Sequence, residues 1–171
     1  MTLFITRRPT PIGEVIAWRT ERGLVAMGFS DRMSSPEVGM PDPDRTVSRA
    51  IDRYFTGSLE AFDELELDLQ GTPLQQRIWG LLRSIPAGET RSYGELGAAV
   101  GTSGRVVGNA MAANPACLAL PCHRVVRSDG TWSVYAHGSH RKRWLLDHER
   151  KKNAEWTGRS IRRLNKLANR R

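Results

Sequence analysis

Short apolar stretches separated by polar residues open the chain. Gly13–Trp18 and Leu24–Phe29 are apolar, and the polar residues 19–23 lie between them. This spacing predicts a β-hairpin with a loop longer than two residues. Residues 31–45 are rich in Ser, Pro and Asp and predict a loop.

The pattern then changes to helical spacing. Apolar residues recur three and four positions apart and are followed by a glycine suited to a C-terminal cap: Val47, Ala50, Ile51, Tyr54, Phe55 and Gly57. Leu65, Leu67 and Leu69 alternate with acidic residues, which predicts a half-buried strand.

From Gly71 onward the pattern predicts mainly helices. Residues 72–75 place Thr, Pro and Gln at the positions of a capping box, so a helix should begin there and end before Pro86. Residues 92–95 form a second capping box, which opens a short helix through Val100. A last core helix should carry Trp144, Leu145, Leu146 and Glu149.

The helix at 93–100, the break at Gly101 and a further helix at about 104–113 form a helix-turn-helix pattern. Such a pattern indicates either a DNA-binding unit or two packed core helices. The second helix carries one charge, Arg105, and small residues at Gly108, Ala110 and Ala112. This composition suits close approach to a partner surface.

A cysteine that attacks carbon must act as a thiolate, and a neighbouring base is the usual activator. Cys122 has His123 beside it in the sequence. The alternative interpretation is a small buried residue next to a surface histidine. A zinc site is a third alternative, although the spacing fits no closed structural pattern; its ligand types would come from Cys117, Cys122, His123, His137 and His140.

Length, cysteine count and charge limit the class of protein. The chain has 171 residues, a net charge of +8 and two cysteines, too few for a disulfide scaffold. No apolar run approaches the roughly 20 residues that cross a bilayer. Nine basic residues and one acid follow from Arg150 to the end, so this segment accounts for the whole net charge. A basic segment of this kind is either a solvated end or a phosphate-binding arm.

Several motifs together resemble one family. Pro121-Cys122-His123-Arg124-Val125, preceded by Asn114-Pro115, resembles the active-site motif of the O6-alkylguanine-DNA alkyltransferases. Residues 72–79, 85–95 and 141–146 resemble the same family in order and spacing. The resemblance covers about residues 71–149.

The resemblance implies a chemistry. Cys122 would accept an alkyl group from O6-alkylguanine, or from O4-alkylthymine, in a single turnover without a cofactor or metal. His123 would act as base through a bound water, Glu149 would orient His123, and Asn114 would hold the supporting turn. The alternative is a damage-sensing or regulatory DNA binder with poor transfer.

The resemblance also implies how alkylated double-stranded DNA is held. Tyr93, Tyr135 and Lys142 would contact the flipped nucleotide, and Arg105 would enter the base stack in its place. A recognition helix would lie in the minor groove of the DNA, where its small residues would fit the narrow groove. The DNA-binding set is Arg105, Gly108, Ala110, Ala112 and Arg124.

The expected fold is α+β. Residues 1–70 would form a small RNase H-like α/β domain and residues 71–150 a mostly helical domain with the helix-turn-helix. Residues 151–171 would be a basic tail. The expected setting is the cytoplasm, at the nucleoid in a prokaryote, with no membrane and no obligate protein partner, and with cooperative assembly on DNA left open.

Two positions depart from the family pattern. Val134 stands where a glycine is usual, and His137 stands where a small residue is usual. Both lie in the segment expected to close over the flipped base, so a narrower or differently gated pocket is predicted.

Overall fold

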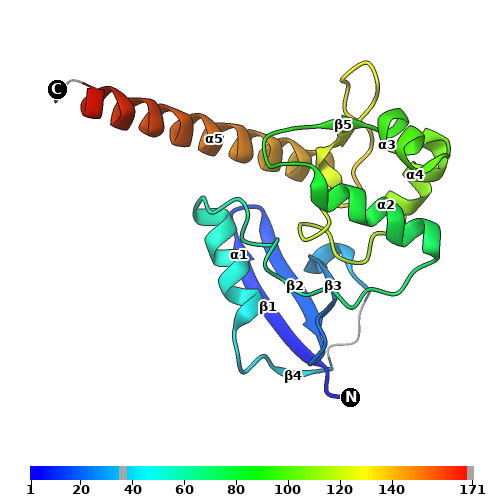
Figure 1. Ribbon diagram of the computed structural model, residues 1–171. Helices are drawn as coiled ribbons and strands as arrows, with labels where there is room; N and C mark the ends of the chain where they lie inside the picture. Colours follow the sequence, from blue (N-terminus) through cyan, green and yellow to red (C-terminus); the bar gives the residue numbers. More distant parts are fainter. Residues whose placement is uncertain (35–37, 169–171) are drawn as a thin grey trace.

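The computed structural model describes residues 1–34 and 38–168, with side chains through Glu155 (Figure 1). In this part of the chain a sheet with α1 forms one half and a group of helices with a second, smaller sheet forms the other. The predicted α+β class is therefore confirmed.

The larger sheet has the strand order β3-β2-β1-β4. The strands β2 (Gly13–Arg19) and β3 (Leu24–Phe29) pair antiparallel, as the predicted hairpin requires. The hydrophobic pattern contained no sign of β1 (Phe4–Thr10), which pairs antiparallel with β2 along its whole length. A short β4 (Met40–Pro41) runs parallel to β1.

Between β3 and α1 (Thr46–Thr56) the predicted loop contains only the turn η1 (Ser30–Arg32) and β4 as regular elements among its described residues. Gly57 ends α1 at φ 120°, as its capping position predicts. The strand predicted at Leu65–Leu69 is wrong. This segment makes a single parallel bridge, from Leu67 to Leu24: the Leu24 N–H donates to the Glu66 carbonyl at 2.8 Å and the Asp68 N–H donates to the Leu24 carbonyl at 2.9 Å, which is too little pairing for a strand.

The second half follows the predicted helices closely. Helix α2 (Pro73–Ser84) and helix α3 (Tyr93–Val100) each begin with a complete capping box. Gly101 ends α3 in the left-handed region at φ 71°, and α4 (Gly104–Ala112) follows. The short strands β5 (Arg91–Ser92) and β6 (Val125–Val126) pair in parallel and tie the start of α3 to the turn η2 (Cys122–Arg124).

Helix α5 (Ser139–Ala168) carries the predicted core residues and projects from the body (Figure 1). The boundary predicted at residue 150 falls inside this helix. The side chains from residue 156 onward, which hold most of the basic tail's charge, lie outside the described residues. None of the helices in the described chain is long and apolar enough to cross a membrane.

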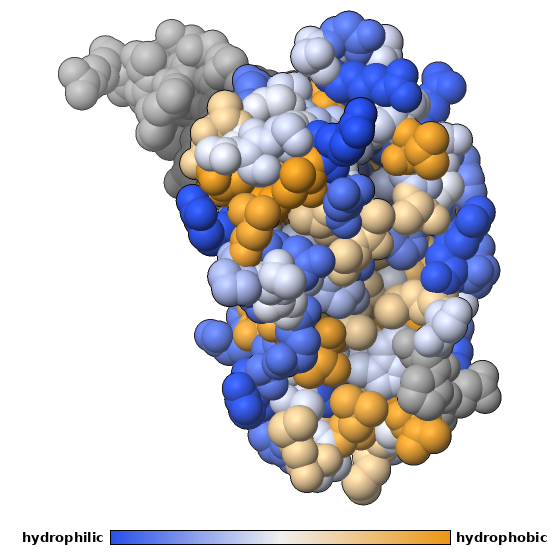
Figure 2. Space-filling view, turned by 90° about the vertical axis from the view of Figure 1, so that its right-hand side faces the viewer, coloured by the Kyte–Doolittle hydropathy of each residue, from blue (hydrophilic) through white to orange (hydrophobic). Residues whose placement is uncertain are grey.

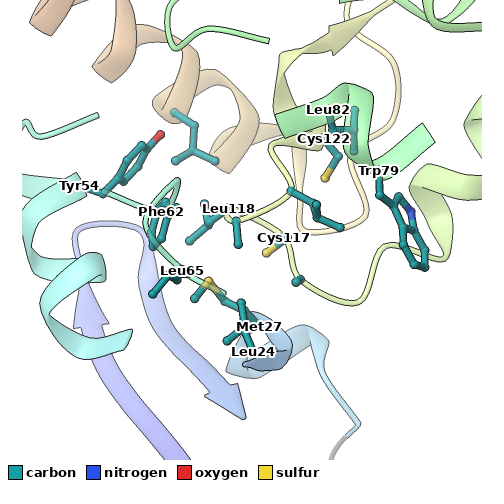
Figure 3. Close-up of a cluster of buried hydrophobic side chains, with 14 of the residues drawn as sticks. Leu24, Met27, Tyr54, Phe62, Leu65, Trp79, Leu82, Cys117, Leu118 and Cys122 are labelled. Atoms are coloured by element: carbon teal, nitrogen blue, oxygen red, sulfur yellow. The ribbon is translucent and has the colours of Figure 1, made fainter. Parts of the chain in front are cut away.

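One hydrophobic core joins the two halves (Figure 3). Leu24 and Met27 from β3 and Phe62 from the loop after α1 belong to the same buried cluster as Trp79 of α2 and Leu118. Cys117 and Cys122 lie in this cluster too. Cys122 is thus held by residues from both halves of the chain.

Candidate active site

Cys122 begins η2 at the bottom of an open pocket of about 520 Å³. The pocket lies between α4, the segment after η1, and the loop before α5; its lining includes Tyr93, Gly108, Met111, Asn114, Tyr135, His137 and Lys142. Only 9% of the cysteine is exposed. A small group that enters this pocket can therefore reach the sulfur, whereas bulk solvent has little access.

Asn114 holds the loop that leads to the cysteine. Its side-chain amide donates to the carbonyl of Leu120 at 3.0 Å, and its side-chain oxygen accepts from the backbone N–H of Ala116 at 2.9 Å. The N–H of Cys122 donates to the carbonyl of Leu120 at 2.7 Å, so the same short loop fixes the thiol. This is the supporting turn that the resemblance implied for Asn114.

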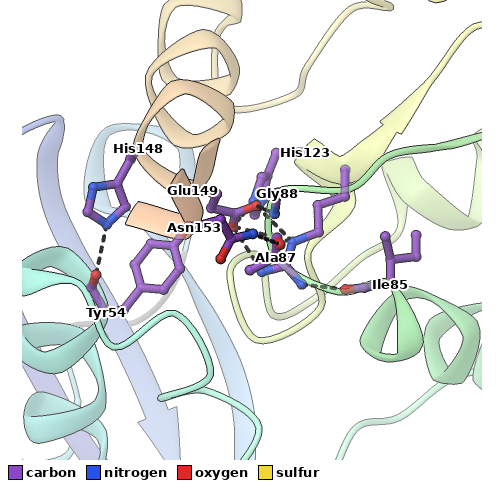
Figure 4. Close-up of polar contacts among 9 residues, drawn as sticks. Tyr54, Ile85, Ala87, Gly88, His123, His148, Glu149 and Asn153 are labelled. Carbon is purple, nitrogen blue, oxygen red and sulfur yellow. Dashed lines mark hydrogen bonds and ion pairs between the residues drawn. The ribbon is translucent and has the colours of Figure 1, made fainter. Parts of the chain in front are cut away.

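His123, which follows Cys122 in the chain, belongs to a buried group of charges (Figure 4). His123 Nε2 lies 2.7 Å from Glu149 Oε1, and both side chains are almost fully buried. Arg124 Nη2 donates to the same oxygen at 2.9 Å, and the N–H of Gly88 donates to Oε2 at 3.0 Å. The structure thus brings His123 and Glu149 together as predicted.

Burial and charge set the protonation states here. Burial tends to raise the pKa of Glu149, but the charges and hydrogen bonds of His123 and Arg124 outweigh it and hold that pKa well below its usual range. Burial lowers the pKa of His123, against the opposing pull of Glu149. Burial raises the pKa of the Cys122 thiol, although Asn114 and Lys142 work the other way. The resting pair is therefore a thiol and a neutral imidazole at neutral pH.

Hydrogen bonds through Ser133 link two polar residues of the pocket wall, Tyr93 and Lys142. Tyr93, the first residue of α3, shares a hydrogen bond of 2.6 Å with the hydroxyl of Ser133. Lys142 Nζ donates to Ser133 Oγ at 3.3 Å and to the carbonyl of Val125 at 2.6 Å. Burial lowers the pKa of Lys142 and raises that of the Tyr135 hydroxyl, which stays protonated. Sequence reasoning missed Ser133, since a lone serine in a loop carries no signal.

Helix α4 presents one face to the pocket and the other to the core. Arg105, Gly108 and Ala112 follow helical spacing on one side; Arg105 and Ala112 are exposed, and Gly108 and Ala112 line the pocket. Val107 and Ala110 are buried on the other side. The Ala110 carbonyl accepts a hydrogen bond of 3.0 Å from the indole of Trp79. The predicted DNA contact of Ala110 is therefore wrong, because this residue faces α2.

The predicted DNA contact of Arg124 is also wrong. The residue is 6% exposed, and its guanidinium is occupied by Glu149 and by the carbonyl of Ile85, at 2.6 Å from Nη1. A charge buried in this way needs its partner and cannot reach a phosphate.

The two unusual loop residues differ in placement. Val134 is 90% exposed, whereas His137 is half-buried on the pocket wall. The imidazole of His137 lies 5.4 Å from the ring of Tyr135 and 5.8 Å from that of Phe29, measured between centroids. Arg141 holds the loop from below by donating to the His137 carbonyl at 3.0 Å. His137 therefore takes up volume in the pocket that Cys122 also lines.

Within the described residues, no three His, Cys, Asp or Glu side chains are grouped so as to hold a metal ion. His123 already uses one nitrogen for Glu149.

Comparison with known proteins places this site in a class. Residues 73–151 match the family model described as 6-O-methylguanine DNA methyltransferase, DNA binding domain. The crystal structure of the Mycobacterium tuberculosis O6-methylguanine methyltransferase superposes with a TM-score of 0.77 at 34% identity, over 88% of this chain and 94% of that one. The same organism's OGT in complex with DNA gives 0.78 at 35% identity, over 89% and 94%.

Sequence relatives define the family more closely. The methylated-DNA–protein-cysteine methyltransferase of Salmonella typhimurium is 48% identical over 60% of this chain, a match that spans only 61% of its own length. The protein of that name from Mycolicibacterium paratuberculosis is 38% identical over 83% of this chain and 89% of its own. The chain belongs to the methylated-DNA–protein-cysteine methyltransferase family.

Proposed function

We propose that the protein repairs alkylated DNA directly, by moving an alkyl group from O6 of guanine to the sulfur of Cys122. The observation that carries the proposal is a thiol at the base of an open pocket, backed by a buried histidine–glutamate pair. In the reaction the S–C bond forms as the C–O6 bond breaks. The resulting thioether is a poor leaving group, so each molecule acts once.

The thiol proton has a defined acceptor. His123 is neutral, and Glu149 occupies its Nε2, which leaves Nδ1 free to accept a proton. His123 Nδ1 is buried and has no hydrogen-bond partner among the described residues. A bound water would carry the proton from Cys122 to this nitrogen, as the resemblance implies. Glu149 then stabilises the imidazolium that forms.

The guanine must accept a proton as its bond to the alkyl group breaks. Tyr135 and Lys142 line the pocket as buried donors and are suited to contact the flipped base. Tyr93 lies at the N-terminus of α3, where it would act on the target nucleotide's phosphate or supply the proton.

We infer that α3 and α4 form a helix-turn-helix that docks in the minor groove. The exposed face of α4 supports this, because Gly108 and Ala112 permit close approach and Arg105 stands at its start. Figure 2, which faces the side on which α4 lies, has weakly polar and mildly hydrophobic residues in its middle, hydrophilic residues on its left and right flanks, and hydrophobic residues along its lower edge. Extruding a nucleotide costs a few kcal/mol, which an inserted side chain helps to offset.

For residues 1–70 we infer an RNase H-like fold. Its support is the antiparallel β3-β2-β1 order continued by a parallel β4, with α1 packed on the sheet.

The decisive experiment uses mass spectrometry to detect transfer of a methyl group to the sulfur of Cys122. Incubation with duplex O6-methylguanine DNA should add one methyl group to the tryptic peptide 106–124. That peptide holds both cysteines, so fragment ions must place the methyl on Cys122 rather than Cys117. Cys117→Ser should still accept the methyl and Cys122→Ser should not. Tight DNA binding without methyl transfer would instead support a damage-sensing binder.

Arg105→Ala tests the DNA interface. Its reaction with duplex DNA should slow far more than its reaction with the free O6-benzylguanine base, because only the duplex requires a nucleotide to be extruded. Equal losses on both substrates would count against the insertion role.

A further inference from the structure

A tyrosine from the other half of the chain reaches the catalytic carboxylate. The hydroxyl of Tyr54, on α1, donates to Glu149 Oε1 at 2.7 Å (Figure 4). Tyr54 lies outside residues 73–151, the segment that matches the DNA-binding domain. No sequence motif singled it out, since its spacing marks it only as a core residue of α1.

The tyrosine is held rigidly where it makes this contact. It is 1% exposed, and its ring packs against Phe62, with 4.9 Å between ring centroids, and edge-on against Phe55 at 5.2 Å. His148, the neighbour of Glu149 on α5, lies with Nε2 2.9 Å from the Tyr54 carbonyl. Helix α1 is thereby fixed against α5 at the point where the carboxylate lies.

The oxygen that Tyr54 contacts is the one that serves the base. Glu149 Oε1 accepts from Tyr54, from His123 Nε2 and from Arg124, through Nη2 at 2.9 Å and Nε at 3.3 Å. Glu149 Oε2 accepts from the Gly88 N–H and from Arg124 Nε. Donors from three residues therefore share the charge of Oε1. Each donor limits how strongly that oxygen binds the others.

We propose that Tyr54 is a positioning residue for alkyl transfer, which fixes the direction and shares the charge of the Glu149 oxygen that holds His123. The proposal rests on the proposed function for its kinetic consequence, but its electrostatic consequence exists in the free protein. It makes the first half of the chain part of the reactive machinery.

The groups around His123 determine the direction in which its pKa moves when the Tyr54 hydroxyl is removed. Glu149 favours the imidazolium, whereas the charges of Arg124 and Lys142, together with burial, disfavour it. Burial and the charge of Glu149 raise the pKa of Tyr54, so the tyrosine remains a neutral donor across the working pH range. When its hydroxyl is removed, more of the Oε1 charge falls on His123, and the pKa of the imidazole should rise.

The test uses Tyr54→Phe in the full-length protein. An upward shift of about one unit in the His123 pKa, a tenfold change in its protonation equilibrium, is expected by NMR titration of the histidine rings. His123→Gln assigns the resonance. The low-pH limb of the methyl-transfer rate should move upward by the same amount. Phe62→Leu disturbs the packing around the same ring without touching the hydrogen bond, so it should leave both titrations in place.

The outcomes separate the two proposals. Unchanged titrations in Tyr54→Phe, or an equal shift in Phe62→Leu, would overturn the role of Tyr54. A shifted His123 titration in a protein that transfers no methyl would support the link and overturn the repair function instead.

Discussion

Replacing Arg124 tests whether this residue stabilises the buried carboxylate of Glu149 or binds DNA phosphate. Replacing it with Met keeps much of the side-chain length and removes the guanidinium. Glu149, fully buried, would then lose the cation that donates to it from Nε and Nη2 at 3.1 and 2.9 Å. The carbonyl of Ile85 would lose its donor as well.

The expected cost is large because an uncompensated charge remains inside. Breaking a buried ion pair from one side costs about 3–5 kcal/mol. With a urea m-value of about 2 kcal/mol/M, the midpoint of unfolding should fall by about 1.5–2.5 M with m unchanged. Tryptophan fluorescence follows the transition, since Trp79 is buried in the same core. Adding Glu149→Gln should recover part of the loss, because that double variant no longer buries an unpaired charge.

Arg105→Met is the matched control, since this residue is an exposed arginine on α4. It should change stability by less than about 0.5 kcal/mol. A loss of stability below about 1 kcal/mol in Arg124→Met would refute the argument. So would a fall of about 0.9 in the slope of log affinity against log salt for the folded variant, which is the effect expected when the protein binds one phosphate fewer.

Three further outcomes are expected. His137→Gly should raise the rate with O6-benzylguanine more than the rate with O6-methylguanine, because the imidazole narrows the pocket beside Tyr135; an unchanged ratio of the two rate constants would contradict this. Folding depresses the pKa of Glu149, so its stabilising contribution is present above the unfolded carboxyl value of about 4.3 and is lost as the pH falls below it. Glu149→Gln should therefore lose less stability than the unmodified protein between about pH 5 and pH 2 in urea titrations. Ending the chain after Glu155 spares the hydrogen bond of 2.5 Å from the Asn153 side chain to the Ala87 carbonyl. The slope of log affinity for DNA against log salt should fall by about 0.9 for each phosphate that the shortened chain no longer binds. An unchanged slope would show that the tail does not touch phosphate.

Local chemistry made the second half of the chain predictable. The capping boxes at Thr72 and Ser92 and the glycine at 101 act within a few residues, so their sequence signal survives in any fold. The strand β1 is a different case. Its residues include adjacent arginines, and the partly exposed Arg8 donates two hydrogen bonds of 2.7 Å to Asp52, which lies far along the chain.

The site also combines residues that local sequence motifs reveal with residues that only long-range packing brings together. Cys122, His123 and Asn114 lie within one short segment, and their pairing with Glu149 followed from a family resemblance. The side on which each residue of α4 lies could not be assigned before the packing of α2 was known, which is why the prediction for Ala110 was wrong. Tyr54 could not have been found at all from the sequence, because its partner is 95 residues away.

The buried charge network is better explained by chemistry than by stability. Replacing such a network with apolar side chains is often neutral or stabilising, so holding the fold together does not require it. An ionised carboxylate on Nε2, however, leaves Nδ1 as the only proton acceptor of His123, and this is the state that a buried, protonated thiol needs. The donors that hold this carboxylate come from α1, from the loop after α2 and from η2, so three separate parts of the fold position the carboxylate that His123 contacts. Arg124→Met and Tyr54→Phe then separate two effects at one oxygen: the first should lower stability, and the second should move the pH at which the base works.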